Sequence, residues 1–160
     1  MNDDDLAVLC IFNEAGNQPF EGQVAVGIVI RNRIALHFPS DGTMANTIEH
    51  GNGVGFSWVG FAIVDGRYTR VADGPDEIAA RVQQLLTEAQ ATAAWSICEK
   101  AWADSGAWFD GQPLSFTPGP EFDKLDKQTV MYLNPAISSA AWATPDKEVA
   151  KIFDHTFFHA

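Results

Sequence analysis

The chain has 160 residues, of which 46% are hydrophobic and 19% charged, a size and composition typical of one compact globular domain. Its formal net charge of −11 argues against a nucleic-acid partner and against adhesion to an anionic membrane, because both draw their affinity from clustered Lys and Arg. No apolar run reaches the roughly 20 residues that span a bilayer, and the acidic N-terminus is unlike a secretory signal, so we expect no membrane insertion and no export route of the chain's own.

Two helices are predicted at the start of the chain. The aspartates at 3–5 supply a cap and an acidic first turn for a helix over 3–15, and Gly16 is a natural stop. A second helix is expected over 20–37, because its centre is apolar on nearly all sides, as in a helix buried in a core. Residues 31–33, two arginines and an asparagine, are expected to bring this helix back to the surface.

The rest of the chain alternates irregular segments with shorter elements. Residues 40–74 show no helical period, and 56–64 within them are expected to form a short strand pair or an extended binding loop. The later elements are expected in this order: a helix from Pro75 that breaks at the capping-box sequence 87–90, a further helix to about Ala103, a loop over 104–121, a strand over 129–133, a short helix over 144–153, and a last strand or extended segment over 155–159. We therefore predict a mostly helical α+β fold in a single domain of residues 1–160.

Glu14 stands in the last turn of the first predicted helix, where the helix dipole disfavours negative charge. Beside an apolar helix face, such a carboxyl is expected to have a raised pKa. A carboxyl that holds its proton near neutral pH is what a general acid requires. On spacing alone, a solvated glutamate that happens to end a helix is the alternative.

A second carboxylate would complete the pair of acids that many glycosidases use. Glu21 follows the short turn after Glu14 and is the first candidate, although its place in the first turn of the second helix also suits the helix dipole. Further candidates are Asp65, Asp123 and Glu49, and the sequence does not choose among them.

Aromatic side chains gather in the loop-like segments of the chain. Loop aromatics often line sugar sites, where flat apolar faces stack and polar tips form hydrogen bonds, although each one alone more often packs in a core. The residues of this set are Phe56, Trp58, Trp108, Tyr132 and Trp142.

His155 and His159 have the i, i+4 spacing that places two metal ligands on one face of a helix. However, the residues between them contain no acid and favour extended structure, and no third ligand is evident. We therefore predict no metal site and no cofactor.

Four blocks of the sequence occur in a recognisable order. The first and most specific runs from Asn13-Glu14-Ala15-Gly16 through Glu21-Gly22-Gln23 to Ile30-Arg31-Asn32-Arg33. The later ones are Phe56-Ser57-Trp58, then Met131-Tyr132-Leu133-Asn134-Pro135 with Trp142-Ala143, and finally Ile152-Phe153-Asp154-His155-Thr156-Phe157-Phe158. Together they span essentially the whole chain, which resembles the SleB/CwlJ-type cell-wall hydrolases, the spore-cortex-lytic enzymes and their relatives.

This resemblance implies a lysozyme-like fold, related to the lytic transglycosylases, with Glu14 as the catalytic acid. The implied reaction is protonation of the glycosidic oxygen between N-acetylmuramic acid and N-acetylglucosamine in a peptidoglycan glycan strand. The muramic C6 hydroxyl or a water molecule would then attack the anomeric carbon. The residues expected to bind the strand are Phe56, Ser57, Trp58, Tyr132 and Trp142, with Glu21 as the possible second carboxylate.

The chain also departs from the family's pattern. Gly16-Asn17-Gln18 stands where the family has Arg-Gly-Glu, and of the family's His-Tyr-His segment only Tyr132 is kept. Without a signal or a separate wall-binding domain, the chain is expected to be a monomeric phage endolysin or virion-associated lysin, made in the cytoplasm of the bacterial host and acting on its cell wall. Two other classes stay open: a zinc-dependent amidase or peptidase that uses His155 or His159, and a non-catalytic glycan-binding or virion structural protein.

Overall fold

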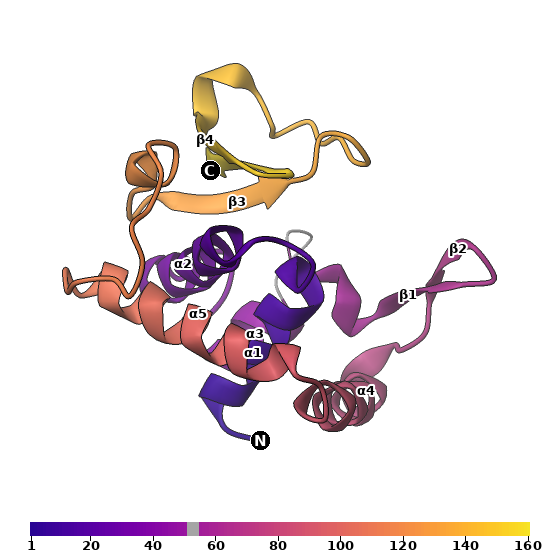
Figure 1. Cartoon of the computed structure of the whole chain (residues 1–160). Helices are drawn as coiled ribbons and strands as arrows, with labels where there is room; N and C mark the ends of the chain where they lie inside the picture. The colour runs from indigo at the N-terminus through magenta and orange to yellow at the C-terminus, as the bar shows by residue number, and fades with distance from the viewer. Residues whose placement is uncertain (51–54) are drawn as a thin grey trace.

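The computed structural model describes residues 1–50 and 55–160, and Figure 1 shows how their elements are arranged. The predicted α+β class is confirmed, since these residues form a helical body with two small antiparallel sheets. The helices are α1 (Asp3–Ala15), α2 (Phe20–Leu36), α3 (Met44–Glu49), α4 (Gly74–Gln90) and α5 (Ala94–Phe109), with 3-10 turns η1 (Ser57–Val59), η2 (Phe122–Lys124) and η3 (Pro145–Lys147). The strands are β1 (Phe61–Val64), β2 (Arg67–Arg70), β3 (Thr129–Leu133), β4 (Glu148–Ile152) and β5 (His155–His159). No helix of the described residues is long and apolar enough to cross a membrane.

The first two helices were predicted correctly and form the centre of the molecule. The Asn2 side chain caps α1 by accepting a hydrogen bond of 2.8 Å from the Asp5 backbone N–H. In α2 every residue from Gly22 to Ile30 is buried, because α1, α5 and the three-stranded sheet all pack against it. Gly27 allows the close approach of α5, since a Cβ there would lie 2.8 Å from the Ser105 side chain.

The prediction that residues 31–33 return α2 to the surface is wrong for two of them, because Asn32 and Arg33 are buried. Figure 1 shows the sheet lying across α2. The Asn32 side chain donates to backbone carbonyls just before and at the start of β3, and Arg33 Nε donates to the Val130 carbonyl at 2.6 Å. Buried polar groups are tolerated when they are hydrogen-bonded. Here these bonds hold β3 against α2.

The two sheets have simple antiparallel topologies. The three-stranded sheet has the order β3-β5-β4, which confirms the strands predicted over 129–133 and 155–159. The two-stranded sheet is a hairpin of β1 and β2. A strand pair was expected within 56–64, but only β1 lies there, and its partner β2 follows this stretch. Asp65 and Gly66 join these strands and have φ angles of 51° and 76°. A type I′ two-residue hairpin turn requires this left-handed conformation at both central residues.

The helical elements differ from those predicted in three places. α4 continues through the capping-box sequence, because the Thr87 hydroxyl donates to the Gln83 carbonyl one turn earlier instead of starting a new helix. The following helix, α5, extends to Phe109, so the loop begins at 110. The short α3 was not predicted, since its six residues are too few to show a period.

The helix expected over 144–153 is also wrong. Only Pro145–Lys147 make a helical turn, and β4 follows at once. Ala150 and Ile152 are buried while Lys151 between them is exposed, and β4 pairs with β5. Strand pairing and burial therefore outweigh the local helix-start signal. Residues 51–54, part of the stretch expected to be irregular, lie outside the described residues.

Candidate active site

An open cleft of about 530 Å³ is lined by the C-terminal end of α1, the turn that follows it, the segment before η1, and strands β3 and β5. This volume is in the usual range of ligand sites. Side-chain amides are a prominent part of the lining: Asn13, Asn17, Gln18 and Asn134. Aromatic and apolar side chains share it, so the cleft offers both the hydrogen bonds and the flat apolar contacts that sugars use.

Glu14 lines this cleft, partly exposed, at the end of α1. Burial of its carboxyl raises the pKa from 4.5 to about 7, and the neighbouring Tyr132 hydroxyl and Arg33 guanidinium oppose the rise. Desolvation of the carboxylate is thus the main cause, as it is for other carboxyls in apolar surroundings. The direction agrees with the prediction, and a carboxyl with this pKa can give its proton to a bound molecule near neutral pH.

Arg33 is a buried cation of the cleft. Its guanidinium carbon lies 4.9 Å from the centroid of the Phe56 ring, and the bond to Val130 fixes its Nε. Because this charge lowers the pKa of Glu14, it also stabilises the carboxylate that remains after Glu14 has given up its proton. Its place in the Asn32-Arg33 block was the only sequence signal for this role.

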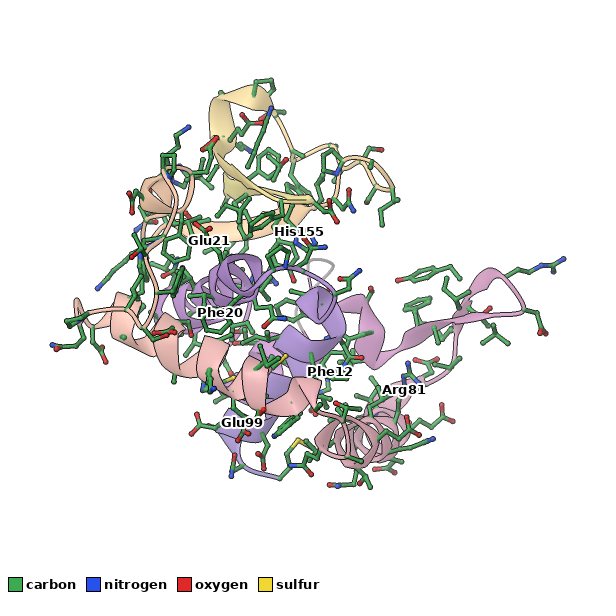
Figure 2. All side chains as sticks on the ribbon, in the orientation of Figure 1. Phe12, Phe20, Glu21, Arg81, Glu99 and His155 are labelled. Atoms are coloured by element: carbon green, nitrogen blue, oxygen red, sulfur yellow. The ribbon has the colours of Figure 1, made fainter. Side chains whose placement is uncertain are left out.

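Tyr132 on β3 and His155 on β5 lie side by side on the sheet wall of the cleft, and their ring centroids are 5.0 Å apart; Figure 2 labels His155 at the edge of the sheet nearest the helices. The Tyr132 hydroxyl lies near enough to Glu14 to influence its pKa. That contact falls short of regular hydrogen-bond geometry, since the buried hydroxyl has no such bond among the described residues. Burial lowers the pKa of His155, with Asp154 opposing it, so the imidazole is neutral near pH 7.

The carboxylate that shares the cleft with Glu14 is Asp154, which was not predicted as a site residue. Gln18 Nε2 donates a hydrogen bond of 2.9 Å to Asp154 Oδ2. The structure corrects the expectation that Glu21 faces Glu14: its Oε1 accepts a hydrogen bond of 2.8 Å from the Gly119 N–H. The first turn of α2 therefore directs this carboxylate to the loop after α5, as Figure 2 shows.

The other acids considered from the sequence also lie elsewhere in the described structure. Asp65 belongs to the β1–β2 turn, Asp123 to η2 and Glu49 to α3, and none of these three lines the cleft. Asp154 could have been found only from its place in the last resembling block, directly before His155.

Four of the five residues predicted to bind the glycan line the cleft: Phe56, Ser57, Tyr132 and Trp142. The fifth, Trp58, does not line the cleft, because its side chain is 8% exposed and packs in the hydrophobic core. Arg81 of α4 donates a 3.1 Å hydrogen bond to the Trp58 carbonyl and so fixes η1 in this orientation. Trp108 is likewise a core-packing residue.

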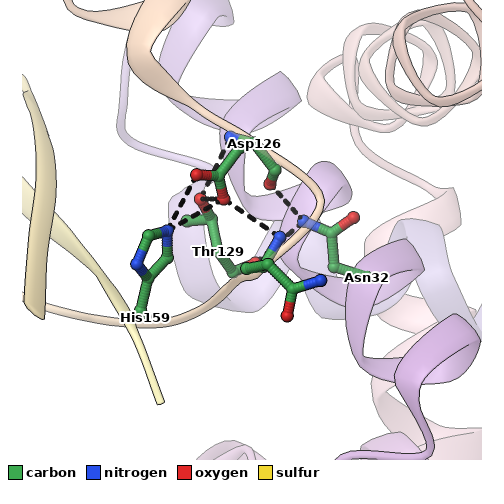
Figure 3. A network of polar contacts seen from close by, with 5 residues as sticks. Asn32, Asp126, Thr129 and His159 are labelled. Carbon is green, nitrogen blue, oxygen red and sulfur yellow. Dashed lines mark hydrogen bonds and ion pairs between the residues drawn. The ribbon is translucent and has the colours of Figure 1, made fainter.

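His155 and His159 have separate environments. His155 lines the cleft, whereas His159 Nε2 contacts both carboxylate oxygens of Asp126 at 3.0 and 2.8 Å (Figure 3). Over residues 1–50 and 55–160, no group of three or more His, Cys, Asp or Glu side chains could hold a metal ion.

Comparisons with known proteins give no further guide to this cleft. No protein-family model matches the sequence, and neither a curated protein nor a solved structure matches it.

Proposed function

We propose that this protein cleaves peptidoglycan glycan strands between N-acetylmuramic acid and N-acetylglucosamine, with Glu14 as the general acid. One observation carries the proposal: a carboxyl whose pKa is raised to about 7 lines an open cleft together with aromatic rings and side-chain amides. A proton donor in a sugar-binding cleft is the basic requirement of glycoside cleavage. The ordered sequence blocks add support, and a lysozyme-like arrangement, with the acid at the end of the first helix, is part of the same proposal.

In the proposed reaction, Glu14 gives its proton to the glycosidic oxygen, and the bond from that oxygen to the anomeric carbon breaks. The departing sugar leaves with a hydroxyl group, and the Glu14 carboxylate is stabilised by Arg33. The muramic C6 hydroxyl or a water molecule then attacks the anomeric carbon and returns a proton to Glu14. Asp154 replaces Glu21 as the candidate second carboxylate.

The local charge of the cleft removes a difficulty with an anionic substrate. The whole chain carries −11, but among the described residues the charged side chains lining the cleft are Glu14, Asp154 and Arg33, with His155 neutral. With Glu14 protonated, Asp154 and Arg33 cancel. The remaining negative charges act through solvent, where salt reduces their effect beyond about 10 Å.

The products released from purified sacculi test this proposal directly. We expect soluble muropeptides in which the glycan is cut, seen by mass spectrometry either as anhydromuropeptides or as products with new reducing ends. EDTA is expected to leave their release unchanged. Products cut at amide bonds, in an EDTA-sensitive reaction, would instead identify a zinc amidase or peptidase. Binding to sacculi without any released fragment would identify a non-catalytic protein.

The pH dependence of cleavage follows from the raised pKa of Glu14. The general acid must be protonated, so kcat/KM is expected to fall as pH rises through about 7. A glutamate with the ordinary pKa of 4.5 would place this fall about two to three pH units lower. Initial rates of turbidity loss at constant ionic strength between pH 4 and 9 measure the profile. A rate that stays constant up to pH 9 would contradict the assigned role.

A further inference from the structure

A second pocket, of about 450 Å³, adjoins the cleft. The two share residues 55–57 in their linings, where the Phe56 ring is buried and Ser57 is exposed. The rest of the pocket is lined by the end of α3, the start of the β1–β2 hairpin and Ile78 of α4. Figure 1 shows this hairpin extending outward from the helical body. A branched ligand in the cleft can therefore extend its branch past Ser57 into the second pocket.

Glu49 supplies a carboxyl to this pocket from the end of α3. Its side chain is only 18% exposed, and burial raises its pKa, while the neighbouring His50 opposes the rise. His50 Nε2 lies 3.8 Å from Glu49 Oε2, a distance too long for a hydrogen bond. A carboxylate that has lost hydration on burial is stabilised by a cation that binds next to it. This part of the lining therefore suits an ammonium group.

Arg70 of β2 lines the same pocket, and its guanidinium carbon lies 4.5 Å from the centroid of the Phe61 ring. The Phe61 ring is stacked on Tyr68, with centroids 4.8 Å apart and an angle of 4° between the planes. This stack orients the guanidinium, whose N–H groups can bind a carboxylate. Arg70 also contacts Asp73 at 3.7 Å, but the two side chains are 54% and 82% exposed. Such an exposed pair is weak, so a bound carboxylate can replace Asp73.

We propose that this pocket binds the peptide stem of peptidoglycan, with Glu49 on the free amine of the stem's diamino acid and Arg70 on a stem carboxylate. The assignment rests on the proposed glycan cleavage. The stem is a branch of the strand, attached through the lactyl group of N-acetylmuramic acid, one of the two sugars at the bond that is cleaved. An uncross-linked stem carries carboxylates and one amine, so its charges complement a guanidinium and a carboxylate in one pocket.

The test uses soluble, uncross-linked glycan strands in three forms: with native stems, with the stem amines acetylated, and with the stems removed by an amidase. The amount of cut glycan is measured by mass spectrometry at low substrate concentration, where the rate reports kcat/KM. We expect the rate of the wild-type protein to fall about fivefold on the acetylated strands, because the amine loses its charge. The rate on the stripped strands should be lower still, because the contact with Arg70 is lost as well.

Two variants and two controls test the residue assignment. The rate of Glu49→Gln should no longer depend on acetylation but should still fall on the stripped strands, whereas for Arg70→Gln the stripped and acetylated strands should give equal rates. The controls are Glu99→Gln, on α5 (Figure 2), and Arg67→Gln, on β2 but outside the pocket. Both should respond as the wild-type protein does. They make the same charge changes elsewhere, and so separate local contacts from the general effect of the net charge of −11.

The outcomes separate this inference from the proposed function. Equal wild-type rates on all three forms, or variants of Glu49 and Arg70 that respond as the wild-type protein does, would overturn the recognition of the stem and leave glycan cleavage standing. If Glu49→Gln does not fold, Arg70→Gln decides alone, since its side chain is 54% exposed and its replacement leaves the core intact. If the wild-type protein cuts none of the three forms, the proposed function fails, and the inference fails with it.

Discussion

Replacement of Glu14 by glutamine is expected to lower the rate of glycan cleavage by about 100- to 10,000-fold, the usual contribution of a general acid. Glutamine has nearly the same shape as glutamic acid but has no proton to give to the glycosidic oxygen. The reaction would then depend on water as the acid, in a cleft where the remaining groups still bind the glycan. Turbidity loss of purified sacculi and the amount of released muropeptide measure the effect.

Glu21→Gln is the matched control, because it makes the same chemical change seven residues further along the chain. Glu21 lies outside the cleft, and a glutamine oxygen can still accept the hydrogen bond from the Gly119 N–H. We expect its cleavage rate to equal that of the wild-type protein, with a loss of stability of about 0.3–1 kcal/mol from the lost charge at the start of α2. Full activity in Glu14→Gln, or an equal loss in both variants, would refute the role of Glu14.

Glu14→Gln is expected to lower the cleavage rate but to raise the stability of the folded protein. The folded-state pKa of about 7 lies above the ordinary value of 4.5, so the folded protein holds a proton that the unfolded chain has released. The stability that this proton provides is complete below the unfolded pKa and is lost as pH rises through about 7. Glutamine does not ionise, and the variant should therefore have a higher melting temperature than the wild-type protein at pH 8. A protein that is more stable but inactive is typical of a removed catalytic acid.

The elements that could be predicted from the sequence are those with local signals. The first two helices have caps, stops and long periodic stretches, and β3 and β5 have runs of strand-forming residues. The predictions fail where contacts with distant segments of the chain determine the local structure or burial. Arg33 and Asn32 have surface-type side chains, yet both are buried because β3, almost 100 residues later, supplies carbonyls to them. Likewise, 148–152 form a strand because β5 is there to pair with.

The candidate site could be predicted only in part, for the same reason. Glu14 has a local anomaly, a negative charge at a helix C-terminus, and the aromatic side chains of Tyr132 and Trp142 also suggested contact with a ligand. Asp154 has no local signal, since its role depends on the turn between β4 and β5 approaching Gln18. Glu21 was predicted beside Glu14 because the two are close along the chain. Its side chain nevertheless lies outside the cleft and contacts the Gly119 N–H.

The second large effect is expected from Asn32→Leu, which should lower the free energy of unfolding by about 1–3 kcal/mol. Asn32 is fully buried, and its Nδ2 donates to the Asp126 and Thr129 carbonyls, both at 2.9 Å (Figure 3). Leucine has a comparable size but removes the Asn32 donor from the buried Thr129 carbonyl, at about 1–3 kcal/mol. The Asp126 carbonyl keeps the hydrogen bond from the Thr129 N–H. Part of this loss is recovered, because the buried Asn32 Oδ1 has no partner in the described structure and is removed as well. The midpoint of urea unfolding measures the change.

His159→Gln is the control within the same network, because it disrupts the contact with Asp126 on the exposed side, where the two side chains are 42% and 48% exposed. Such exposed pairs contribute only about 0.2–1 kcal/mol. A small effect of His159→Gln and a large one of Asn32→Leu would show that the buried bonds of Asn32, and not the outer ion pair, hold β3 on α2. Because β3 also carries Tyr132, Asn32→Leu should lose cleavage activity at temperatures below its melting transition. A loss of stability under about 0.5 kcal/mol, typical of unimportant surface positions, would contradict this account of how the sheet is attached.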